Sequence, residues 1–305
     1  MSTASRPVWR SMLFVPAHVE KFVAKAHTRG ADACILDLED SVPLEMKAEA
    51  RQRIESAARA INEASNGVLG VLVRINNDSE QAAAAPLLEA DLASAVRPGV
   101  AALVIPKVKD AGILHRIATR LDAIEAEAGV GSGSTQLIAQ IEDVQALPVI
   151  DAIAQSSVRM LGMSLGSEDF SASAGMQPTP EALYQPNQMV VFACRRANIL
   201  PFGFPSSIAE YSDEEAFAAS VKRAAEMGFV GAFCIHPKQA AMLNTGFSPS
   251  AAEIAAAKAL MTAVAEAERE SRGAFAHNGK MVDPPVIRRA QEVLCRAASL
   301  PTVSE

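Results

Sequence analysis

Two pairs of acidic residues, each following a short apolar segment, are the clearest candidates for chemistry in this chain. Glu142 and Asp143 form the first pair, and Glu168 and Asp169 form the second. Residues 144–155 between them have the apolar spacing of a helix, so the stretch predicts a β-α-β unit with parallel neighbouring strands. Such strands lie about 4.8 Å apart, so carboxylates at their ends can converge on one cation. Glu142 and Asp169 are therefore candidate ligands for Mg²⁺, which accepts two carboxylates completed by waters and substrate oxygens.

The ordinary alternative for such pairs is a solvated loop or a helix N-cap. Polar residues recur at the ends of the other strand-like segments, however, and this favours a shared site. In a barrel of parallel strands, catalytic groups collect at the carboxyl ends of the strands. The additional residues at these ends are Asp37, Glu39, Asp40, Arg74, Asn76, Lys107 and His236.

The elements that must position these residues alternate regularly along the chain. Eight strand-like segments alternate with helical segments over about 240 residues, which predicts an α/β fold with a parallel sheet. This number of units fits a (β/α)₈ TIM barrel over residues 1–245, followed by a C-terminal helical extension over residues 246–305. A doubly wound open sheet is the alternative, but no GxGxxG motif follows an early strand.

The composition limits the classes of partner. The 305 residues are 50% hydrophobic and carry a formal net charge of −7, which argues against general binding to nucleic acid or a membrane surface. Four widely spaced cysteines without a CxxC pair indicate reduced core residues and not disulfides or zinc ligands. No apolar run reaches the length of a membrane span, and no signal-peptide core is present, so we expect a cytoplasmic protein.

A set of motifs runs through nearly the whole chain in one order. They read RSMLFVPA, GADACILDLEDSVPLEMKAEAR, LVRIN, LVIPKV, IE at 141–142, GSEDF, GFVGAFCIHPKQ and GAFAHNGKMVDPPVIRRA. Together they resemble the citrate lyase β-subunit-like proteins of the HpcH/HpaI aldolase superfamily, which has malyl-CoA and citramalyl-CoA lyases as relatives. The resemblance implies a (β/α)₈ barrel, one bound Mg²⁺ and assembly as a homotrimer or hexamer.

The resemblance also implies roles for particular residues. Glu142 and Asp169 match the metal ligands of the family, and Arg74 matches its oxoacid-binding arginine. Asp283 matches the aspartate of a GKMxD turn, which serves as the acid/base and closes over the site of a neighbouring subunit. Residues 246–305 would accordingly cap that subunit. The plain aldolases of the superfamily lack this turn, so the likeness is to the branch that acts on CoA thioesters.

The implied activity is a Mg²⁺-dependent retro-Claisen cleavage of a 3-hydroxy-dicarboxyl-CoA thioester of the malyl-, citramalyl- or citryl-CoA type. The products would be a small oxoacid and an acyl-CoA. Two alternatives use the same site: a thioesterase acting on malyl-CoA-like substrates, or a citryl-ACP lyase-type subunit of a larger complex. A non-catalytic accessory subunit is a further alternative of a different class.

Four more residues are assigned to substrate binding. Glu39 and Asp40 are expected to orient metal-bound waters and basic partners, and Lys47 is expected to form an ion pair with them, with a solvated helix lysine as its alternative. Arg10 is a candidate contact for the CoA phosphates, although it precedes the first strand and so belongs to the opposite end of the barrel unless the chain folds back. The chain departs from the family at Pro205-Ser206-Ser207, where relatives often carry a Val-Asp pair.

Overall fold

Strands buried on both faces of a parallel sheet consist of nearly continuous apolar residues. The computed structural model describes residues 7–77, 86–209, 212–269 and 275–300, and eight such apolar runs form one parallel sheet in this part of the chain. The strands are β1 (Ser11–Pro16), β2 (Ala33–Asp37), β3 (Gly70–Arg74), β4 (Ala102–Ile105), β5 (Gln136–Ile141), β6 (Met160–Leu165), β7 (Leu200–Phe202) and β8 (Ala232–Cys234).

The sheet curls into a nearly closed barrel. Its strand order is β7-β6-β5-β4-β3-β2-β1-β8, so consecutive strands are neighbours and the predicted (β/α)₈ fold is confirmed. Phe202 of β7 forms a parallel bridge with Gly231, and the Gly203 N–H donates to the Gly231 carbonyl at 2.9 Å, which nearly completes the circle. A Cβ on Gly231 would lie 1.9 Å from the Trp9 carbonyl oxygen, so only glycine fits at this closure.

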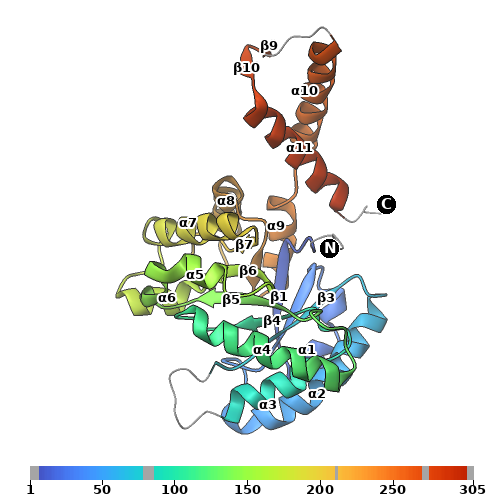
Figure 1. Ribbon diagram of the computed structural model, residues 1–305, viewed down its shortest axis with the longest axis vertical. Coiled ribbons are helices and arrows are strands. Elements are labelled where there is room, and N and C mark those ends of the chain that lie inside the picture. Colours follow the sequence, from blue (N-terminus) through green and yellow to red (C-terminus); the bar gives the residue numbers. More distant parts are fainter. Residues whose placement is uncertain (1–6, 78–85, 210–211, 270–274, 301–305) are drawn as a thin grey trace. The chain divides into compact units, whose positions relative to one another are not determined.

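Helices lie around the barrel (Figure 1). They are α1 (Glu20–Val23), α2 (Lys47–Ala64), α3 (Pro86–Ala95), α4 (Ala111–Ala128), α5 (Ile150–Ala154), α6 (Ser167–Ala174), α7 (Pro180–Ala197), α8 (Glu214–Met227) and α9 (Pro237–Gly246), with 3₁₀ turns at Ala26–Thr28, Leu44–Met46 and Val144–Val149.

Two local expectations differ from the structure, and part of a third falls outside the described residues. The helix expected after β1 is only the short α1 and a 3₁₀ turn. The helix expected after β5 begins as a 3₁₀ turn containing Pro148, because proline lacks an N–H and clashes with the preceding helical turn. The start of the helix expected over 80–96 falls partly on residues 78–85, outside the described residues, and its described part begins at Pro86.

Side chains alternate along each strand between the barrel interior and the layer of helices. The apolar interior consists mainly of Met12, Ile35, Leu72, Val104, Ile138, Phe202 and Phe233. Two residues further along their strands, the same alternation brings Asp37, Arg74 and Gln140 to the inside. The carboxyl end of the barrel therefore carries polar groups above an apolar layer.

The chain divides into two compact units, of which the barrel, Trp9–Phe247, is one. The described residues from Ser248 onward belong to the other. Within this second unit α10 (Ala251–Arg269) packs against α11 (Pro284–Ser299), and β9 (Phe275–His277) pairs antiparallel with β10 (Lys280–Val282). Asp283 is the N-cap of α11 and accepts a hydrogen bond from the Val286 N–H at 3.1 Å. Among the described helices, none is long and apolar enough to cross a membrane.

Candidate active site

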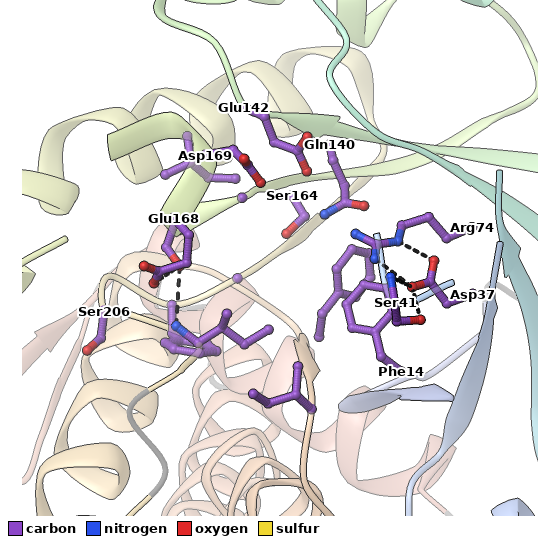
Figure 2. Close-up of a pocket in the computed structure, with 18 of the residues that line it drawn as sticks. Phe14, Asp37, Ser41, Arg74, Gln140, Glu142, Ser164, Glu168, Asp169 and Ser206 are labelled. Carbon is purple, nitrogen blue, oxygen red and sulfur yellow. Dashed lines mark hydrogen bonds and ion pairs between the residues drawn. The ribbon is translucent and has the colours of Figure 1, made fainter. Parts of the chain in front are cut away.

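A cavity of about 280 Å³ opens at the carboxyl ends of the strands (Figure 2). Its lining joins residues from β1, β2, β3, β5, β6 and β8 and from the segments after β2, β5, β6, β7 and β8. The polar part of the lining contains Asp37, Ser41, Arg74, Gln140, Glu142, Ser164, Glu168 and Asp169, and the apolar part contains Phe14, Phe204, Ile208, Phe233 and Ile235. The cavity is thus the place where the sequence predicts a site.

The structure brings Glu142 and Asp169 to the same side of this cavity. Glu142 directly follows β5, while Asp169 lies in the first turn of α6, because β6 ends four residues earlier, at Leu165. Figure 2 shows the two carboxyl groups side by side. A Cβ on Gly166 would lie 2.5 Å from Cγ of Glu142, so the glycine leaves the space that the glutamate side chain fills.

Burial, together with the negative charges of Glu39 and Asp169, raises the pKa of Glu142 to about 8 against the opposing effect of Arg74 and Lys107. The side chain is only 5% exposed. A buried acid next to another acid is ionised most readily when a cation lies between them. Two carboxylates in this setting fit Mg²⁺, a hard cation that keeps several waters or takes substrate oxygens. Among the described residues, no group of three or more His, Cys, Asp or Glu could hold a metal ion. A Mg²⁺ ion on Glu142 and Asp169 would therefore take waters or substrate oxygens as its other ligands.

Arg74 ends β3 on the other side of the cavity. Its Nε and Nη2 donate to the two Asp37 carboxylate oxygens at 2.6 and 2.7 Å, and its Nη1 lies 3.0 Å from Oε2 of Glu39. Its Cζ lies 4.6 Å from the centre of the Phe14 ring, within range of a cation–π contact. Because Nη1 and Nη2 each carry two hydrogens, both can also donate to an anion in the cavity.

Asp37 keeps Arg74 in place and is itself well satisfied. Burial alone would raise its pKa, but the hydrogen bond and charge of Arg74 outweigh burial and hold the pKa of Asp37 below its usual value. The Ser41 hydroxyl also donates to Asp37 at 2.5 Å. Asp37 therefore remains ionised and orients the arginine.

Glu39 and Asp40 contact the basic groups, as the sequence predicts. Glu39 is buried between Arg74 and Lys107, whose Nζ lies 2.7 Å from Oε1, and burial raises the pKa of Glu39 despite both cations. Asp40 is more exposed and lies 3.8 Å from Arg74 and 3.4 Å from Lys107. Both acids thus lie around the arginine, and neither lines the cavity itself.

The expected ion pair of Lys47 is corrected by the structure. Its buried Nζ donates to the Leu38 and Glu39 carbonyls at 2.8 Å and to Oδ1 of Asn76 at 2.7 Å. Lys47 therefore holds the backbone that carries Glu39, and the described structure shows no direct bond from it to a carboxylate. Lys47 binds these carbonyls because it is the first residue of α2, next to the loop that follows β2.

Arg10 lies outside this cavity, and Asp283 belongs to a different unit of the chain. Arg10 precedes β1 at the amino end of the barrel, where Nε and Nη2 bind the Asp32 carboxylate at 2.8 and 2.7 Å. The chain does not fold back to bring it to the carboxyl end, which places the predicted phosphate contact at the wrong end of the barrel for this cavity. Asp283 belongs to the second unit, and its catalytic role stays a prediction.

Sequence reasoning missed two buried polar groups in the cavity, Gln140 and Ser164. They are paired across β5 and β6 by the strand register, and both point into the space between the acidic pair and Arg74 (Figure 2). Oε1 of Gln140 is buried and has no hydrogen-bond partner in the part of the chain that the structure describes. Strand alternation could have identified Gln140, because it lies two residues before Glu142 and faces the same side.

The segment that departs from the family motif also contacts the site. The Ser207 hydroxyl donates to Oε1 of Glu168 at 2.5 Å, and the Ile208 N–H donates to the Ser167 hydroxyl at 3.3 Å. These bonds attach the loop after β7 to the first turn of α6, which also carries Asp169. In the segment that differs from the family motif, Ser207 thus stabilises one wall of the cavity.

In a parallel barrel, catalytic groups collect at the carboxyl ends of the strands, where this chain carries two acids and an arginine. The chain belongs to the HpcH/HpaI aldolase/citrate lyase family, whose pattern matches residues 10–237. The curated proteins most similar to this chain include a citrate lyase subunit and malyl-CoA lyases, which are carbon–carbon lyases.

Three relatives illustrate the range of that family. The citrate lyase subunit beta of Leuconostoc mesenteroides subsp. cremoris is 33% identical over 93% of this chain and 92% of its own length. The L-malyl-CoA/beta-methylmalyl-CoA lyase of Rhodobacter capsulatus is 34% identical over 96% of each chain. The crystal structure of the protein CitE from Mycobacterium tuberculosis in complex with magnesium, acetoacetate and coenzyme A is 27% identical, covers 97% of this chain and 99% of that chain, and gives a TM-score of 0.73.

Proposed function

We propose that this protein is a Mg²⁺-dependent carbon–carbon lyase that cleaves a 3-hydroxy-dicarboxyl-CoA thioester of the malyl-, citramalyl- or citryl-CoA type. The observation that carries the proposal is the convergence of Glu142, Asp169 and Arg74 on one cavity. Relatives named as malyl-CoA lyases, and a similar structure that contains magnesium, acetoacetate and coenzyme A, support the cation and the substrate class.

In this proposal Glu142 and Asp169 hold the cation, which when bound supplies a Lewis acid for the oxygens of the oxoacid portion. Arg74 donates from Nη1 and Nη2 to the carboxylate of that portion, and Asp37 keeps the guanidinium in the required orientation. The apolar wall around Phe204 and Phe233 limits the access of water.

Cleavage breaks the bond between the hydroxyl-bearing carbon and the thioester α-carbon. The hydroxyl loses its proton as the keto group forms, and the α-carbon takes up a proton as the acyl-CoA forms. We assign this acid/base role to Asp283 of a neighbouring subunit in a homotrimer or hexamer. In the structure Asp283 is the N-cap of α11 and is followed by two prolines that restrict the local backbone.

The proposed reaction is tested by incubating the protein with malyl-CoA and Mg²⁺ and following glyoxylate, malate and free CoA. Lyase activity releases glyoxylate and acetyl-CoA. Hydrolysis releases malate and free CoA without glyoxylate, which would establish the thioesterase alternative. Absence of turnover with malyl-, citramalyl- and citryl-CoA in the presence of Mg²⁺ would contradict both.

A citryl-ACP lyase-type subunit is the second candidate, because citrate lyase beta subunits match the chain about as closely as malyl-CoA lyases do. Its test is co-purification with an acyl carrier protein and cleavage of the citryl-ACP thioester in preference to citryl-CoA. The chain would then depend on partner subunits for turnover, and the isolated protein would cleave CoA thioesters poorly.

The role of Asp283 is tested by mixing two inactive variants. Asp283→Ala should bind Mg²⁺ and pyruvate normally but lose turnover, and Glu142→Gln should lose Mg²⁺ binding. Under subunit exchange the mixture should recover part of the activity, since a mixed interface can unite one intact metal site with one intact Asp283. No recovery despite proven exchange would rule out a site shared between subunits.

A further inference from the structure

Lys107, which follows β4, has a backbone conformation that lysine rarely adopts. Its φ is +53°, in the left-handed region. The other described non-glycine residues with positive φ are all asparagines, namely Asn66, Asn198 and Asn278. Asparagine tolerates this region because its short side chain can bond locally, whereas an ordinary residue there costs about 1–2 kcal/mol. A lysine in this position therefore calls for a physical reason.

The backbone N–H of Lys107, at the start of this left-handed turn, points at the acidic pair. This N–H donates to Oε2 of Glu142 at 2.9 Å. The next residue is bound to the same strand as Glu142, because the Val108 N–H donates to the Gln140 carbonyl at 3.1 Å. On the other side, the Asn77 amide donates to the carbonyls of Pro106 at 2.8 Å and of Lys107 at 3.3 Å. Hydrogen bonds on both sides therefore hold the turn.

The side chain of Lys107 extends from the same turn to a different acid. Its Nζ lies 2.7 Å from Oε1 of Glu39 and 3.4 Å from Oδ1 of Asp40. Glu39 in turn lies 3.0 Å from Nη1 of Arg74. One residue thus joins the acid proposed to hold the cation and the acids that surround the substrate-binding arginine.

We propose that Lys107 is a positioning residue whose two parts act separately: its left-handed backbone fixes the Glu142 carboxylate for the cation, and its ammonium group fixes Glu39 beside Arg74. This inference rests on the proposed function and adds a requirement for a backbone conformation at one position. It predicts that residues which tolerate positive φ preserve cation binding even without the lysine side chain.

The backbone part is tested with four variants, Lys107→Gly, Lys107→Asn, Lys107→Ala and Lys107→Val. All four lack the ammonium group, so differences among them report the backbone. Glycine and asparagine adopt positive φ readily, whereas β-branched valine disfavours it most. We expect Mg²⁺ affinity, measured by calorimetric titration, to be similar for Gly and Asn and at least about tenfold weaker for Val, since a hydrogen bond to a charged group contributes about 1.5–3 kcal/mol.

A matched control separates this effect from general strain. Asn198 also has positive φ, at 55°, but it is the C-cap of α7. Asn198→Val should lower the thermal midpoint in the way that Lys107→Val does, yet leave Mg²⁺ affinity unchanged. Equal weakening of Mg²⁺ binding in both valine variants would mean that the loss reflects stability alone and would overturn the proposal.

The side-chain part is tested with Lys107→Met, which keeps the chain length and removes the charge. Among the described residues, Arg74 is then the remaining cation within ion-pair distance of Glu39, so its ion pair with Glu39 strengthens. We expect Mg²⁺ affinity near the wild-type value but a KM for the thioester raised about tenfold, or about 1.4 kcal/mol. Lys109→Met is the control, because Lys109 lies two residues further on and pairs with Asp143 at 3.1 Å. A KM for Lys107→Met no higher than for Lys109→Met would remove the side-chain role.

Failure of this inference can be told apart from failure of the proposed function. Suppose that wild-type protein binds Mg²⁺ and Glu142→Gln does not. Equal Mg²⁺ affinities in all the Lys107 variants would then overturn only the inference about Lys107. If wild-type protein binds no Mg²⁺, the proposed cation role fails, and crystal structures of the Gly and Val variants decide the inference. The bond from residue 107 to Glu142 should persist in the Gly variant and break in the Val variant; its persistence in the Val variant would overturn the backbone role.

Discussion

Buried ionic groups lie at both ends of this barrel, and among the described residues the two ends differ in how well these groups are satisfied. At the amino end, Arg159 donates to the Glu125 carboxylate through Nη1 and Nη2 at 2.8 Å, and to Asp122 at 2.5 Å. Glu125 also accepts from the Thr135 and Gly133 N–H groups at 2.8 and 2.7 Å. Although burial opposes it, these bonds lower the pKa of Glu125 to about 2.

The carboxyl end has the opposite balance. Burial raises the pKa of Glu142 to about 8, burial also raises the pKa of Glu39, and Gln140 has a buried oxygen without a partner among the described residues. At the amino end, the described groups around Arg159 satisfy one another's charges and hydrogen bonds. At the carboxyl end, Glu142, Glu39 and Gln140 keep charge or hydrogen-bonding capacity that a bound cation or substrate could satisfy. We infer that a raised pKa of a buried acid, increased by neighbouring negative charge and not offset by partners within the chain, marks a candidate functional site.

The largest expected effect comes from removing the acidic pair. Glu142→Gln and Asp169→Asn should each abolish measurable Mg²⁺ binding and lower kcat/KM more than about 1000-fold, or about 4 kcal/mol. Neither should reduce the free energy of unfolding in metal-free protein, since each removes a charge from an acidic excess. Calorimetric titration with Mg²⁺ and urea unfolding measure the two quantities. Unchanged Mg²⁺ affinity in both variants would contradict the metal site.

The amino end should respond in the reverse manner. Arg159→Met leaves Glu125 buried without its cation, and breaking a buried pair in this way costs about 3–5 kcal/mol. We expect this loss in urea unfolding, with kcat/KM of the folded fraction unchanged. Arg97→Met is the control, because its partner Glu55 lies 3.2 Å away on the exposed surface and such pairs contribute at most about 1 kcal/mol. A comparable loss in both variants would show that the Arg159 cluster has no special structural role.

The pH dependence of stability should sharpen the contrast. The folded-state pKa of Glu142, about 8, lies above the ordinary value of 4.5, so the folded state binds more protons between these values. Its contribution is complete below pH 4.5 and is lost as the pH rises through 8. Metal-free protein should lose about 2 kcal/mol between pH 6 and pH 8 relative to Glu142→Gln, as measured by urea unfolding. Parallel pH profiles of the two proteins would mean that Glu142 titrates normally.

The sequence predicts the barrel because its signals are local and repeat. Apolar strands, polar strand ends and helices recur eight times, and each unit can be assigned from its own residues. Arg74, Glu142 and Asp169 follow from this pattern together with the resemblance, because a parallel barrel collects strand ends at one face. The cavity confirms that the three residues are brought together.

Other parts of the site depend on contacts that a single sequence does not reveal. Lys47 looks like a partner for acids, but its ammonium group reaches the Leu38 and Glu39 carbonyls instead. The left-handed backbone of Lys107 is a further feature of this kind, because a lysine in the sequence does not predict a positive φ. The charge of Arg10 suggests a contact with CoA phosphates, whereas its position before β1 predicts that it lies at the amino end of the barrel. The structure agrees with the second prediction, because Arg10 pairs with Asp32 at that end.

The smallest expected effect concerns two buried glutamines that differ in their partners. Gln140 leaves Oε1 without a hydrogen bond in the described structure, at a cost of about 1–3 kcal/mol. Gln140→Leu removes this unsatisfied group at similar volume, so the free energy of unfolding should rise by about 1 kcal/mol. If the substrate hydroxyl donates to Oε1, kcat/KM should fall about tenfold at the same time. Urea unfolding and the lyase assay measure these opposite changes.

Gln239 provides the matched control, because it is also buried but has hydrogen-bond partners for both its oxygen and its nitrogen. Its Oε1 accepts from the Ile235 and His236 N–H groups at 2.9 and 3.1 Å, and its Nε2 donates to the Ile208 carbonyl at 3.0 Å. Gln239→Leu leaves those backbone groups without partners and should lower the free energy of unfolding by about 1–3 kcal/mol. The same substitution should thus stabilise one glutamine position and destabilise the other. A loss of stability at both positions would mean that Gln140 has a structural role, and that its Oε1 is not kept available for a hydrogen bond from the substrate.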